Sequence, residues 1–560
     1  MMNKRKLGLH GWGRHTVLVS IMMMAWMMVA VPYAAAQTKF VRVMWNDSPD
    51  KNVVVGFTAT NGGAYLKYGT STNAAGWSRA DVTRTETLGE SETKIVSQFV
   101  QLSNLSPNTR YYMQACDSIQ CGTRYWFKTM GSAPQDMTFI AGGDSRTNRS
   151  VLQTANKMVA KIRPDFVYFG GDLTDNAASN ELALWLQDWE LSYPTDSIDG
   201  MTWKYIPGLV VAVGNHEDYR MDFVCTVFGA EKNNDGRCTN RDTYGAISIN
   251  GSQMRLYNLN SQLRSLAAEH QEQTDWMIQD LKGPGKTAQW RIAGYHVPAL
   301  PRTSYKQEYT PEMLAWNRLF FEHKVNVAFE SDAHVMKVTA PVKPSDTLND
   351  YEVISSGTVY IGEGAWGAPL RDADRPAAWL KDLASDYNFH VLQFKASKLE
   401  VRTVLFNVDL SKVGSVTLAQ RQASASALPS GLPIRKMGTQ EVYSLVRDTD
   451  LRTKEAPLAS LVSGTPISGI SVAKDEGKYF EISVPAGKTS LELKLSGANG
   501  DADLYVSAAV NPTLFNYDFR SAGYTSNEAI VINTPVAGKY YILVHGYDPT
   551  TALSLTATAK

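Results

Sequence analysis

Five short motifs place ionisable or amide side chains directly after apolar, strand-like segments. In chain order they are GGDSR (Asp144, Arg146), GGDLTDN (Asp172, Asp175), GNHE (Asn215, His216, Glu217), GYH (His296) and ESDAH (Asp332, His334). Carboxylate, amide-oxygen and imidazole groups bind hard and borderline metal cations, and a two-metal site needs one carboxylate shared between the ions. Two ions about 3.5–4 Å apart clamp the oxygens of a phosphoryl group during an in-line displacement. A single Gly-Asp pair is usually a turn or a helix cap, whereas five such motifs in order indicate one convergent site.

The segments before these motifs predict how the side chains come together. Apolar strands are expected at 137–141, 166–169, 209–213, 290–293 and 325–329, with helical patterns between them. Alternating strands and helices predict an α/β domain, in which ligands bind at the carboxyl ends of the strands. The motif residues follow those ends, and we therefore expect them to share a pocket.

Two further β-rich units flank this domain. Residues 37–131 contain short alternating segments separated by turn residues, and Leu105–Tyr111 has the pattern of a tyrosine corner, which is typical of β-sandwiches. Residues 463–560 form the second unit. The α/β domain is expected over 132–408, and the Ser-, Ala- and Pro-rich residues 409–462 are expected to be a linker with at most one short element.

The N-terminus and the cysteines predict export. Residues 1–36 combine early basic residues, an apolar run of about 16 residues and small residues before Gln37, which favours a cleaved signal peptide over a retained anchor. Two short-range disulfides, Cys116 with Cys121 and Cys225 with Cys238, fit an oxidising compartment. The alternative, a four-thiolate zinc site, lacks the paired short spacings that it needs. We expect a secreted or periplasmic bacterial protein with no membrane span after signal removal.

The overall charge excludes one class of partner. The chain has 55 basic and 55 acidic residues. A nucleic acid bound through a strongly basic surface is therefore not expected. The expected partner is a small phosphorylated substrate.

The five motifs and their order resemble those of the calcineurin-like metallophosphoesterase superfamily. The unit before them resembles the fibronectin type III-like domain at the front of purple acid phosphatases. The resemblance implies two divalent or trivalent ions, drawn from iron, manganese, zinc and magnesium. It implies that the first ion is bound by Asp144 and His334, the second by Asn215 and His296, and both by Asp172. His216 is implied to protonate the leaving group or hold the phosphate, with Glu217 orienting it.

Three positions depart from the pattern of purple acid phosphatases. The tyrosine that binds ferric iron in that family is Asp175 here, which either binds a metal or caps the following helix. The first histidine of the last motif is Asp332, which is expected to bind the second metal or else to orient another ligand. Arg146 is expected to grip phosphate or to pair with Glu217 or Asp175. Residues Glu363, Trp366 and Arg371 are expected to line the substrate cleft.

The last unit resembles the bacterial pre-peptidase C-terminal domain, a jelly-roll-like β-sandwich. The segments on which this resemblance rests include Gly500–Val506 and Gly538–Tyr541. The resemblance implies contact with a surface or polymer and, in some members, calcium. Asp501 and Asp503 are the candidate calcium ligands, and the alternative is that they stabilise a tight turn.

Together these features predict a multidomain hydrolase with a β-sandwich, an α/β metallophosphoesterase domain and a second β-sandwich. We expect hydrolysis of phosphate monoesters, as in acid phosphatases, by direct attack of a metal-bound hydroxide. A phosphodiesterase or nucleotidase with the same metal centre is the first alternative. A surface-binding protein with a degenerate centre is the second.

Overall fold

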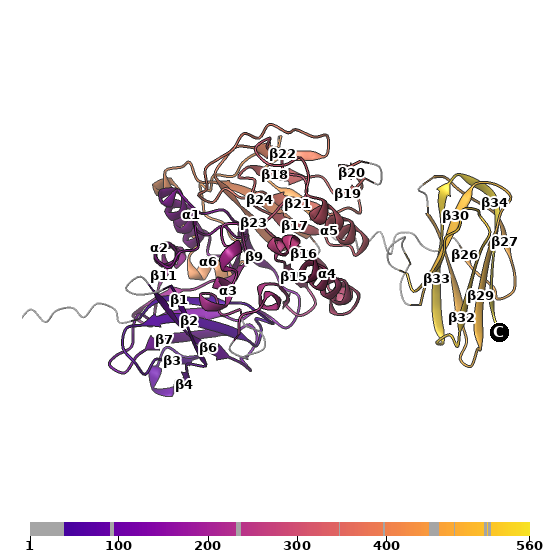
Figure 1. The fold of residues 1–560 in the computed structure, drawn as a ribbon. Helices are drawn as coiled ribbons and strands as arrows, with labels where there is room; N and C mark the ends of the chain where they lie inside the picture. Colours follow the sequence, from indigo (N-terminus) through magenta and orange to yellow (C-terminus); the bar gives the residue numbers. More distant parts are fainter. Residues whose placement is uncertain are drawn as a thin grey trace, which may run out of the picture. The chain divides into compact units, whose positions relative to one another are not determined.

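The computed structural model describes residues 38–89, 94–230, 237–345, 348–395, 398–438, 440–446, 459–474, 477–508, 512 and 517–560 (Figure 1). The expected signal peptide lies outside these residues. Within them the chain forms a β-sandwich, an α/β unit and a second β-sandwich, which confirms the predicted fold class. Among the described helices, none is both long and apolar enough to cross a membrane.

The N-terminal β-sandwich is built from β1 to β8. One sheet has the order β1–β2–β6–β5, and the other includes the order β8–β7–β3–β4. The strands are β1 (Thr38–Met44), β2 (Val53–Ala59), β3 (Tyr65–Gly69), β4 (Ser78–Asp81), β5 (Arg84–Leu88), β6 (Ile95–Leu102), β7 (Arg110–Cys116) and β8 (Tyr125–Lys128). The Tyr111 hydroxyl accepts a hydrogen bond from the Ser106 N–H at 2.8 Å, so the tyrosine corner is formed as predicted. The predicted disulfide between Cys116 and Cys121 is present.

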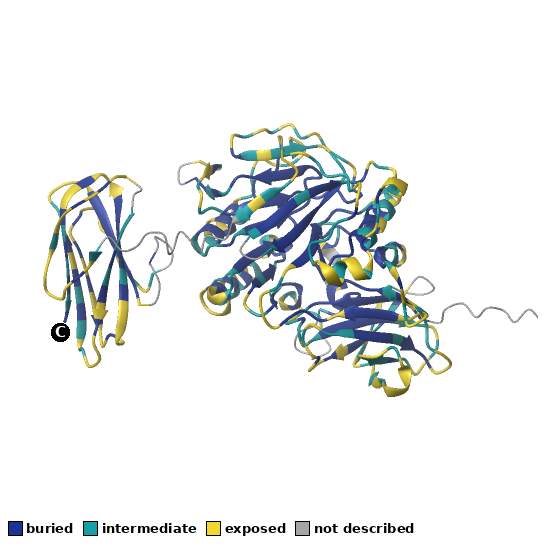
Figure 2. Cartoon of the chain, turned by 180° about the vertical axis from the view of Figure 1, so that it is seen from behind, coloured by how far each residue is buried: buried dark blue, intermediate teal, exposed yellow. Residues whose placement is uncertain are grey.

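The α/β unit contains two sheets with helices on their outer faces (Figures 1 and 2). One sheet has the order β25–β24–β23–β9–β10–β13, and the other has the order β14–β15–β16–β17–β21–β18–β22. Strands β9, β10 and β13 are parallel to one another, as are β15, β16, β17 and β21. The strands of these two sheets are β9 (Met137–Gly142), β10 (Phe166–Phe169), β13 (Gly208–Val211), β14 (Gly245–Ile249), β15 (Met254–Asn258), β16 (Trp290–Gly294), β17 (Val327–Glu330), β18 (Met336–Thr339), β21 (Val359–Gly362), β22 (Leu380–Ala384), β23 (Asn388–Lys395), β24 (Lys398–Leu405) and β25 (Tyr443–Val446).

The helices of this unit follow or precede the parallel strands. They are α1 (Arg149–Ile162), α2 (Ser179–Trp189), α3 (Phe223–Thr226), α4 (Ala267–Lys282) and α5 (Pro311–Glu322). Helix α1 begins just after the first motif, where the side chain of Asn148 caps it by accepting the N–H of Val151. The loop that carries Asp144 is thus fixed between β9 and α1. The predicted disulfide between Cys225 and Cys238 is also present.

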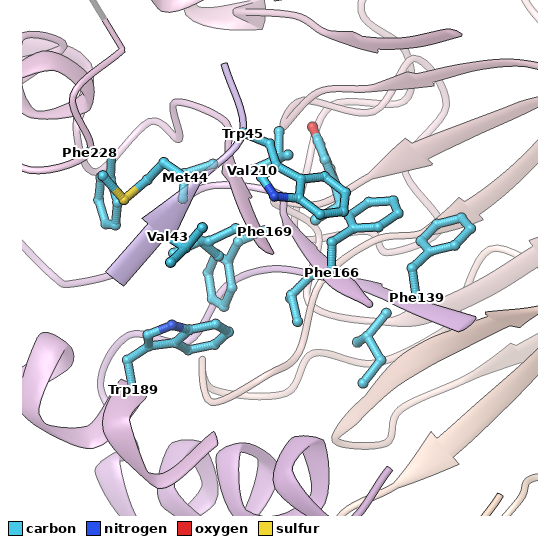
Figure 3. Close-up of a cluster of buried hydrophobic side chains, with 14 of the residues drawn as sticks. Val43, Met44, Trp45, Phe139, Phe166, Phe169, Trp189, Val210 and Phe228 are labelled. Carbon is cyan, nitrogen blue, oxygen red and sulfur yellow. The ribbon is translucent and has the colours of Figure 1, made fainter. Parts of the chain in front are cut away.

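The first β-sandwich and the α/β unit share a sheet and a core. Strand β1 pairs in parallel with β13. Strand β12 (Met201–Tyr205) pairs in parallel with β8 and antiparallel with β11 (Thr195–Ile198). Strands β10 and β13 are buried at every residue, which explains their continuous apolar sequences. Figure 3 shows Trp45 beside Phe166, with ring centroids 5.0 Å apart, and Phe139 stacks on Phe166 at 4.6 Å. This continuous packing forms a buried base for the loops at the strand ends.

The segment expected to be a linker is partly a structural element of the α/β unit. Strand β25 pairs with β24, and the short helix α6 (Leu418–Ala423) lies against the end of α1. The Arg421 guanidinium donates to the backbone carbonyls of Ile162 and Arg163, and the Val416 N–H donates to the carbonyl of Lys161. Residues 410–446 therefore contain a helix and a strand, which is more than the one short element expected. The polar composition of this segment gives no sign that its side chains hydrogen-bond to the backbone of α1.

The C-terminal β-sandwich has its own core. Its sheets have the orders β26–β28–β33–β30–β31 and β27–β34–β29–β32. The strands are β26 (Ala459–Ser460), β27 (Ile467–Val472), β28 (Gly477–Val484), β29 (Ser490–Ser496), β30 (Asp501–Ser507), β31 (Phe519–Ser521), β32 (Glu528–Asn533), β33 (Gly538–Asp548) and β34 (Thr550–Ala559). Alternating burial along β29 and β32 shows one face of each strand turned to the core. Outside this sandwich, β19 (Val342–Pro344) and β20 (Tyr351–Val353) form a separate two-stranded sheet beside α5.

Candidate metal centre

The loops after β9, β10, β13, β16 and β17 bring the five motifs into one pocket. One possible ligand atom from each of Asp144, Asp172 and His334 lies within 4.8 Å of the others, and all three residues are buried. The His334 Nε2 atom lies 3.4 Å from Asp144 Oδ1. Residues separated by as many as 190 positions therefore meet, as the strand-end pattern predicts.

A second group of ligand atoms surrounds His296. Its Nε2 atom lies 3.3 Å from Asp172 Oδ1, 3.1 Å from Asn215 Oδ1 and 3.7 Å from Asp332 Oδ1. The imidazole is fully buried. Asp172 contributes to both groups and lies between them. That is the geometry required of a carboxylate shared by two cations.

The tautomers of both histidines suit metal binding. His296 Nδ1 lies 2.8 Å from the carbonyl oxygen of Gly170, and His334 Nδ1 lies 2.8 Å from that of Pro369. A carbonyl only accepts, so each Nδ1 carries a proton, and Nε2 is the nitrogen that would bind a metal ion once the ring is neutral. His334 Nε2 is buried and has no hydrogen-bond partner, which is costly unless a cation binds there.

Three carboxylates surround the buried imidazole of His296. Burial by itself lowers the pKa of the His296 imidazole, but the nearby carboxylates of Asp172, Asp332 and Asp144 outweigh burial and raise this pKa to about 10. Carboxylates that hold a buried imidazole in its protonated form are equally suited to holding metal cations. The donor set therefore fits a pair of metal ions.

Four of the candidate ligands have a left-handed backbone conformation. The φ angles are 59° for Asp144, 54° for Asp172, 68° for Asp332 and 56° for His334. Each such residue costs on the order of 1 kcal/mol, and clusters of them are found mainly at functional sites. Asp332 is held there by its N–H, which lies 3.1 Å from both carboxylate oxygens of Asp144.

Glu217 fixes the two loops that carry Asp172 and Asn215. Its buried carboxylate accepts hydrogen bonds from the N–H groups of Asp172 (2.9 Å), Leu173 (2.8 Å) and Gly214 (3.0 Å). This differs from the expectation that Glu217 orients His216, because its carboxylate is directed at backbone N–H groups. The structure therefore places Glu217 as a clamp on the ligand loops.

Glycine is required at two positions beside the ligands. A Cβ atom on Gly214 would lie 2.2 Å from the Asp172 nitrogen and 2.3 Å from its Oδ1 atom. A Cβ atom on Gly364, whose φ is +92°, would lie 1.9 Å from Asp144 Oδ2. Both backbones approach the carboxylates more closely than any side chain allows.

His216 lies at the edge of the pocket. Its Nδ1 atom is 2.6 Å from the carbonyl oxygen of Asp175, and its Nε2 atom is 3.8 Å from Asp172 Oδ2. The side chain is 27% exposed, so a substrate can reach it. The backbone carbonyl of Asp175, rather than a carboxylate, orients the ring.

Asp175 and Arg146 form an ion pair on the same side of the pocket. Arg146 Nη1 lies 3.2 Å from Asp175 Oδ1, and Arg146 Nε lies 3.3 Å from Asp172 Oδ2. Asp175 also accepts a hydrogen bond from the Thr147 hydroxyl at 2.6 Å. It does not cap α2, whose N-cap residue is Ala178. Of the two ion pairs expected for Arg146, the one with Asp175 is present. The Glu217 carboxylate instead accepts the backbone N–H groups of Asp172, Leu173 and Gly214.

Lys306 is a site residue that the sequence does not indicate. Its Nζ atom lies 2.5 Å from Asp332 Oδ1, and its side chain is 26% exposed. Burial raises the pKa of Asp332, but His296 and Lys306 together hold it well below its usual range. Lys306 stands in a long polar loop after His296 without a recognisable spacing, so only the fold reveals it.

Two residues expected in the cleft lie beneath it instead. Glu363 and Trp366 are fully buried. Glu363 pairs with the buried Lys337, which also contacts Glu330 at 2.7 Å. The Trp366 ring packs on Phe389 with centroids 4.9 Å apart. The Glu363 carbonyl accepts the His334 N–H, and the Trp366 N–H donates to the carbonyl of Gly143, so both residues support ligand loops. Their side chains are buried in the core and do not line the cleft.

Two family models match the chain. One described as calcineurin-like phosphoesterase matches residues 137–336, and one described as bacterial pre-peptidase C-terminal domain matches residues 476–546. The chain therefore contains a metallophosphoesterase domain of the calcineurin-like superfamily. A pre-peptidase C-terminal domain follows it, and the resemblances predicted for these two parts of the chain are confirmed.

Similar proteins agree with this division. The purple acid phosphatase PPD1 from yellow lupin (Lupinus luteus) seeds has a TM-score of 0.51 and 15% identity, covering 66% of this chain and 72% of that chain, which shows a shared fold. Alkaline serine exoprotease A of Vibrio alginolyticus is 34% identical over 101 residues, 18% of this chain and 19% of that protein. Neutral protease of Vibrio proteolyticus is 31% identical over 94 residues, 17% and 15% of the respective lengths. The chain spans less than a fifth of either protease.

Proposed function

We propose that this protein is an exported, binuclear-metal phosphoesterase that hydrolyses phosphate monoesters. The observation that carries the proposal is the position of Asp172. Its carboxylate belongs to the buried group with Asp144 and His334 and also lies 3.3 Å from His296. A carboxylate shared between two ligand groups is what a pair of catalytic cations requires.

In the proposed centre the first ion is held by Asp144, Asp172 and His334. The second ion is held by Asp172, Asn215, His296 and Asp332. Oxygen atoms dominate the second group, which favours manganese, magnesium or iron over zinc. When bound, the two ions supply positive charge for the phosphoryl oxygens and lower the pKa of a nearby water molecule.

Asp175 is not a ligand in this proposal. Its carboxylate is engaged by Arg146 and the Thr147 hydroxyl, and its side chain is 42% exposed. Without the tyrosine of purple acid phosphatases at this position, no phenolate reaches ferric iron. We therefore expect the iron-loaded protein to lack the purple colour of that family.

His216 and Arg146 act on the substrate. His216 carries its Nδ1 proton toward the Asp175 carbonyl, so its Nε2 atom faces the pocket and, when protonated, donates to the leaving-group oxygen. Arg146 has donors on its guanidinium that match the geometry of a phosphoryl group. Its contact with Asp172 keeps that guanidinium beside the shared carboxylate.

The proposal of export rests on the predicted signal peptide and on the two disulfides of the chain. Disulfides form and persist in oxidising compartments outside the cytosol. The C-terminal domain is proposed to contact a surface or polymer. Asp501 and Asp503 remain its candidate calcium ligands.

The test is metal-dependent hydrolysis by the full chain. Protein stripped by a chelator is reloaded with manganese, iron, zinc or magnesium and assayed on a nitrophenyl monoester and on a bis-nitrophenyl diester. We expect activity to return with metal and to favour the monoester, and Asp172→Ala to lose it. A preference for the diester would support the phosphodiesterase alternative, and no turnover with any metal would refute the proposal.

A further inference from the structure

Two loops beside Asp332, here called the wall of the metal centre, are bonded to each other. They are residues 297–310, after β16, and residues 363–379, after β21. The Ser304 N–H lies 2.6 Å from Asp374 Oδ1, and Arg375 Nη1 donates to the carbonyl of Gln307 at 3.0 Å. These bonds hold the wall in one position.

Two cations on this wall point at the same metal-centre residue. Lys306 Nζ lies 2.5 Å from Asp332 Oδ1, and Arg371 Nη1 donates to the Asp332 carbonyl at 2.7 Å. The Arg371 guanidinium also packs 4.3 Å above the ring of Tyr305. Lys306 and Arg371 are only partly buried, so a ligand beside Asp332 can reach donors of both side chains.

These cations are distinct from the one assigned to the reacting phosphate. Arg146 contacts Asp172 and Asp175, whereas Lys306 and Arg371 contact Asp332. The reacting phosphate belongs beside Asp172, His216 and Arg146. A separate pair of cations is thus left on the Asp332 side of the pocket.

The Asp332 side of the site has an excess of positive charge. Two cations, Lys306 and Arg371, contact one residue with a single carboxylate, Asp332. This step rests on the proposed function, which assigns the reacting phosphate to the other side of the site. A second phosphoryl group on the substrate would match the excess positive charge.

We propose that Lys306 and Arg371 form a subsite for a second phosphoryl group, so that the preferred substrates carry two phosphoryl groups close together. Ammonium and guanidinium groups are the side chains that bind phosphate most strongly. Both residues determine specificity and take no part in breaking the bond.

Inorganic pyrophosphate and inorganic phosphate are the probes. Their binding to the manganese-loaded full chain is measured by calorimetry for the wild type, Lys306→Gln, Lys306→Arg and Arg371→Gln. Lys381→Gln, an exposed lysine on β22, is the control with the same change of charge. Metal content and thermal unfolding are measured for every variant. If Arg371→Gln fails to fold, the comparison of Lys306→Gln with Lys306→Arg still tests the subsite.

The wild type is expected to bind pyrophosphate at least about ten times more tightly than phosphate. Lys306→Gln and Arg371→Gln each reduce pyrophosphate affinity about tenfold and phosphate affinity less than threefold, while Lys306→Arg and Lys381→Gln stay near the wild type. Equal binding of both probes by the wild type, equal losses for both probes, or loss of metal in Lys306→Gln would overturn the subsite. Turnover of a nitrophenyl monoester by the wild type is a separate readout. If turnover fails while the pyrophosphate preference holds, the proposed function falls and the subsite stands.

Discussion

Replacing Gly364 by alanine should disable the metal centre without removing any ligand. The new Cβ atom would lie 1.9 Å from Asp144 Oδ2, whereas ordinary contacts begin at about 3.4 Å. The Asp144 carboxylate must therefore retreat by roughly 1.5 Å. Metal–ligand distances tolerate changes of only about 0.2 Å, so Asp144 should leave the first metal site.

The expected size of the effect follows from that displacement. A misplacement of about 1 Å in a catalytic site costs on the order of a hundredfold in rate. Alanine at a φ of +92° adds roughly 1–2 kcal/mol of backbone strain. We expect metal content to fall by about one ion per chain and the rate constant for a nitrophenyl monoester to fall at least about a hundredfold.

Gly200→Ala is the matched control for the strain. Gly200 lies in the turn between β11 and β12 with a φ of +73°, and its added Cβ atom would meet nothing within 4 Å. It should lower the unfolding temperature like Gly364→Ala and leave metal content unchanged. The reasoning is refuted if Gly364→Ala retains two ions and normal turnover, or if Gly200→Ala loses metal to the same extent.

Three further predictions concern His216, Glu217 and His390. His216→Ala should lower kcat by about 10²–10⁴-fold at unchanged metal content, with a smaller loss on a nitrophenyl ester than on an alkyl phosphate, whose leaving group needs the proton more; equal losses would contradict a role as proton donor. Glu217→Gln should destabilise the fold by about 1–3 kcal/mol in denaturant titrations, because its amide group cannot accept all three N–H bonds; an unchanged midpoint would argue against the clamp. Burial lowers the pKa of His390 to about 3. As the pH falls below about 6.5, the unfolded chain therefore takes up a proton at this histidine and the native chain does not. The free energy of unfolding should drop by about 2 kcal/mol at pH 5. His390→Gln should flatten this dependence of the unfolding temperature between pH 7 and 5, and equal slopes for both proteins would exclude the histidine as its source.

Much of the site follows from local sequence. Parallel, fully buried strands have continuous apolar sequences, so the ends of β9, β10 and β13 are visible in the chain, and the residues after them must meet at one edge. The two disulfides and the tyrosine corner are equally local, because short spacings and one turn define them. These features needed no knowledge of the tertiary fold.

The remaining features depend on contacts between distant segments. Lys306 reaches Asp332 only because the fold brings the loop after β16 against the loop after β17, and its sequence neighbours are ordinary polar residues. Strand β25 looks like part of a linker because it is short and joins an edge of the sheet. Glycine-rich sequence around Trp366 suggested an open cleft, yet its ring is fully buried and fills the core beneath the loop. The spacing of residues along the sequence does not predict contacts of this kind.

The most direct test of the central claim is the anomalous scattering of a manganese-loaded crystal, measured for the full chain. Two peaks about 3.5–4 Å apart should flank the carboxylate of Asp172, one beside Asp144 and His334 and the other beside Asn215 and His296. A single peak, or peaks that avoid Asp172, would contradict the account of a shared carboxylate holding a pair of catalytic ions.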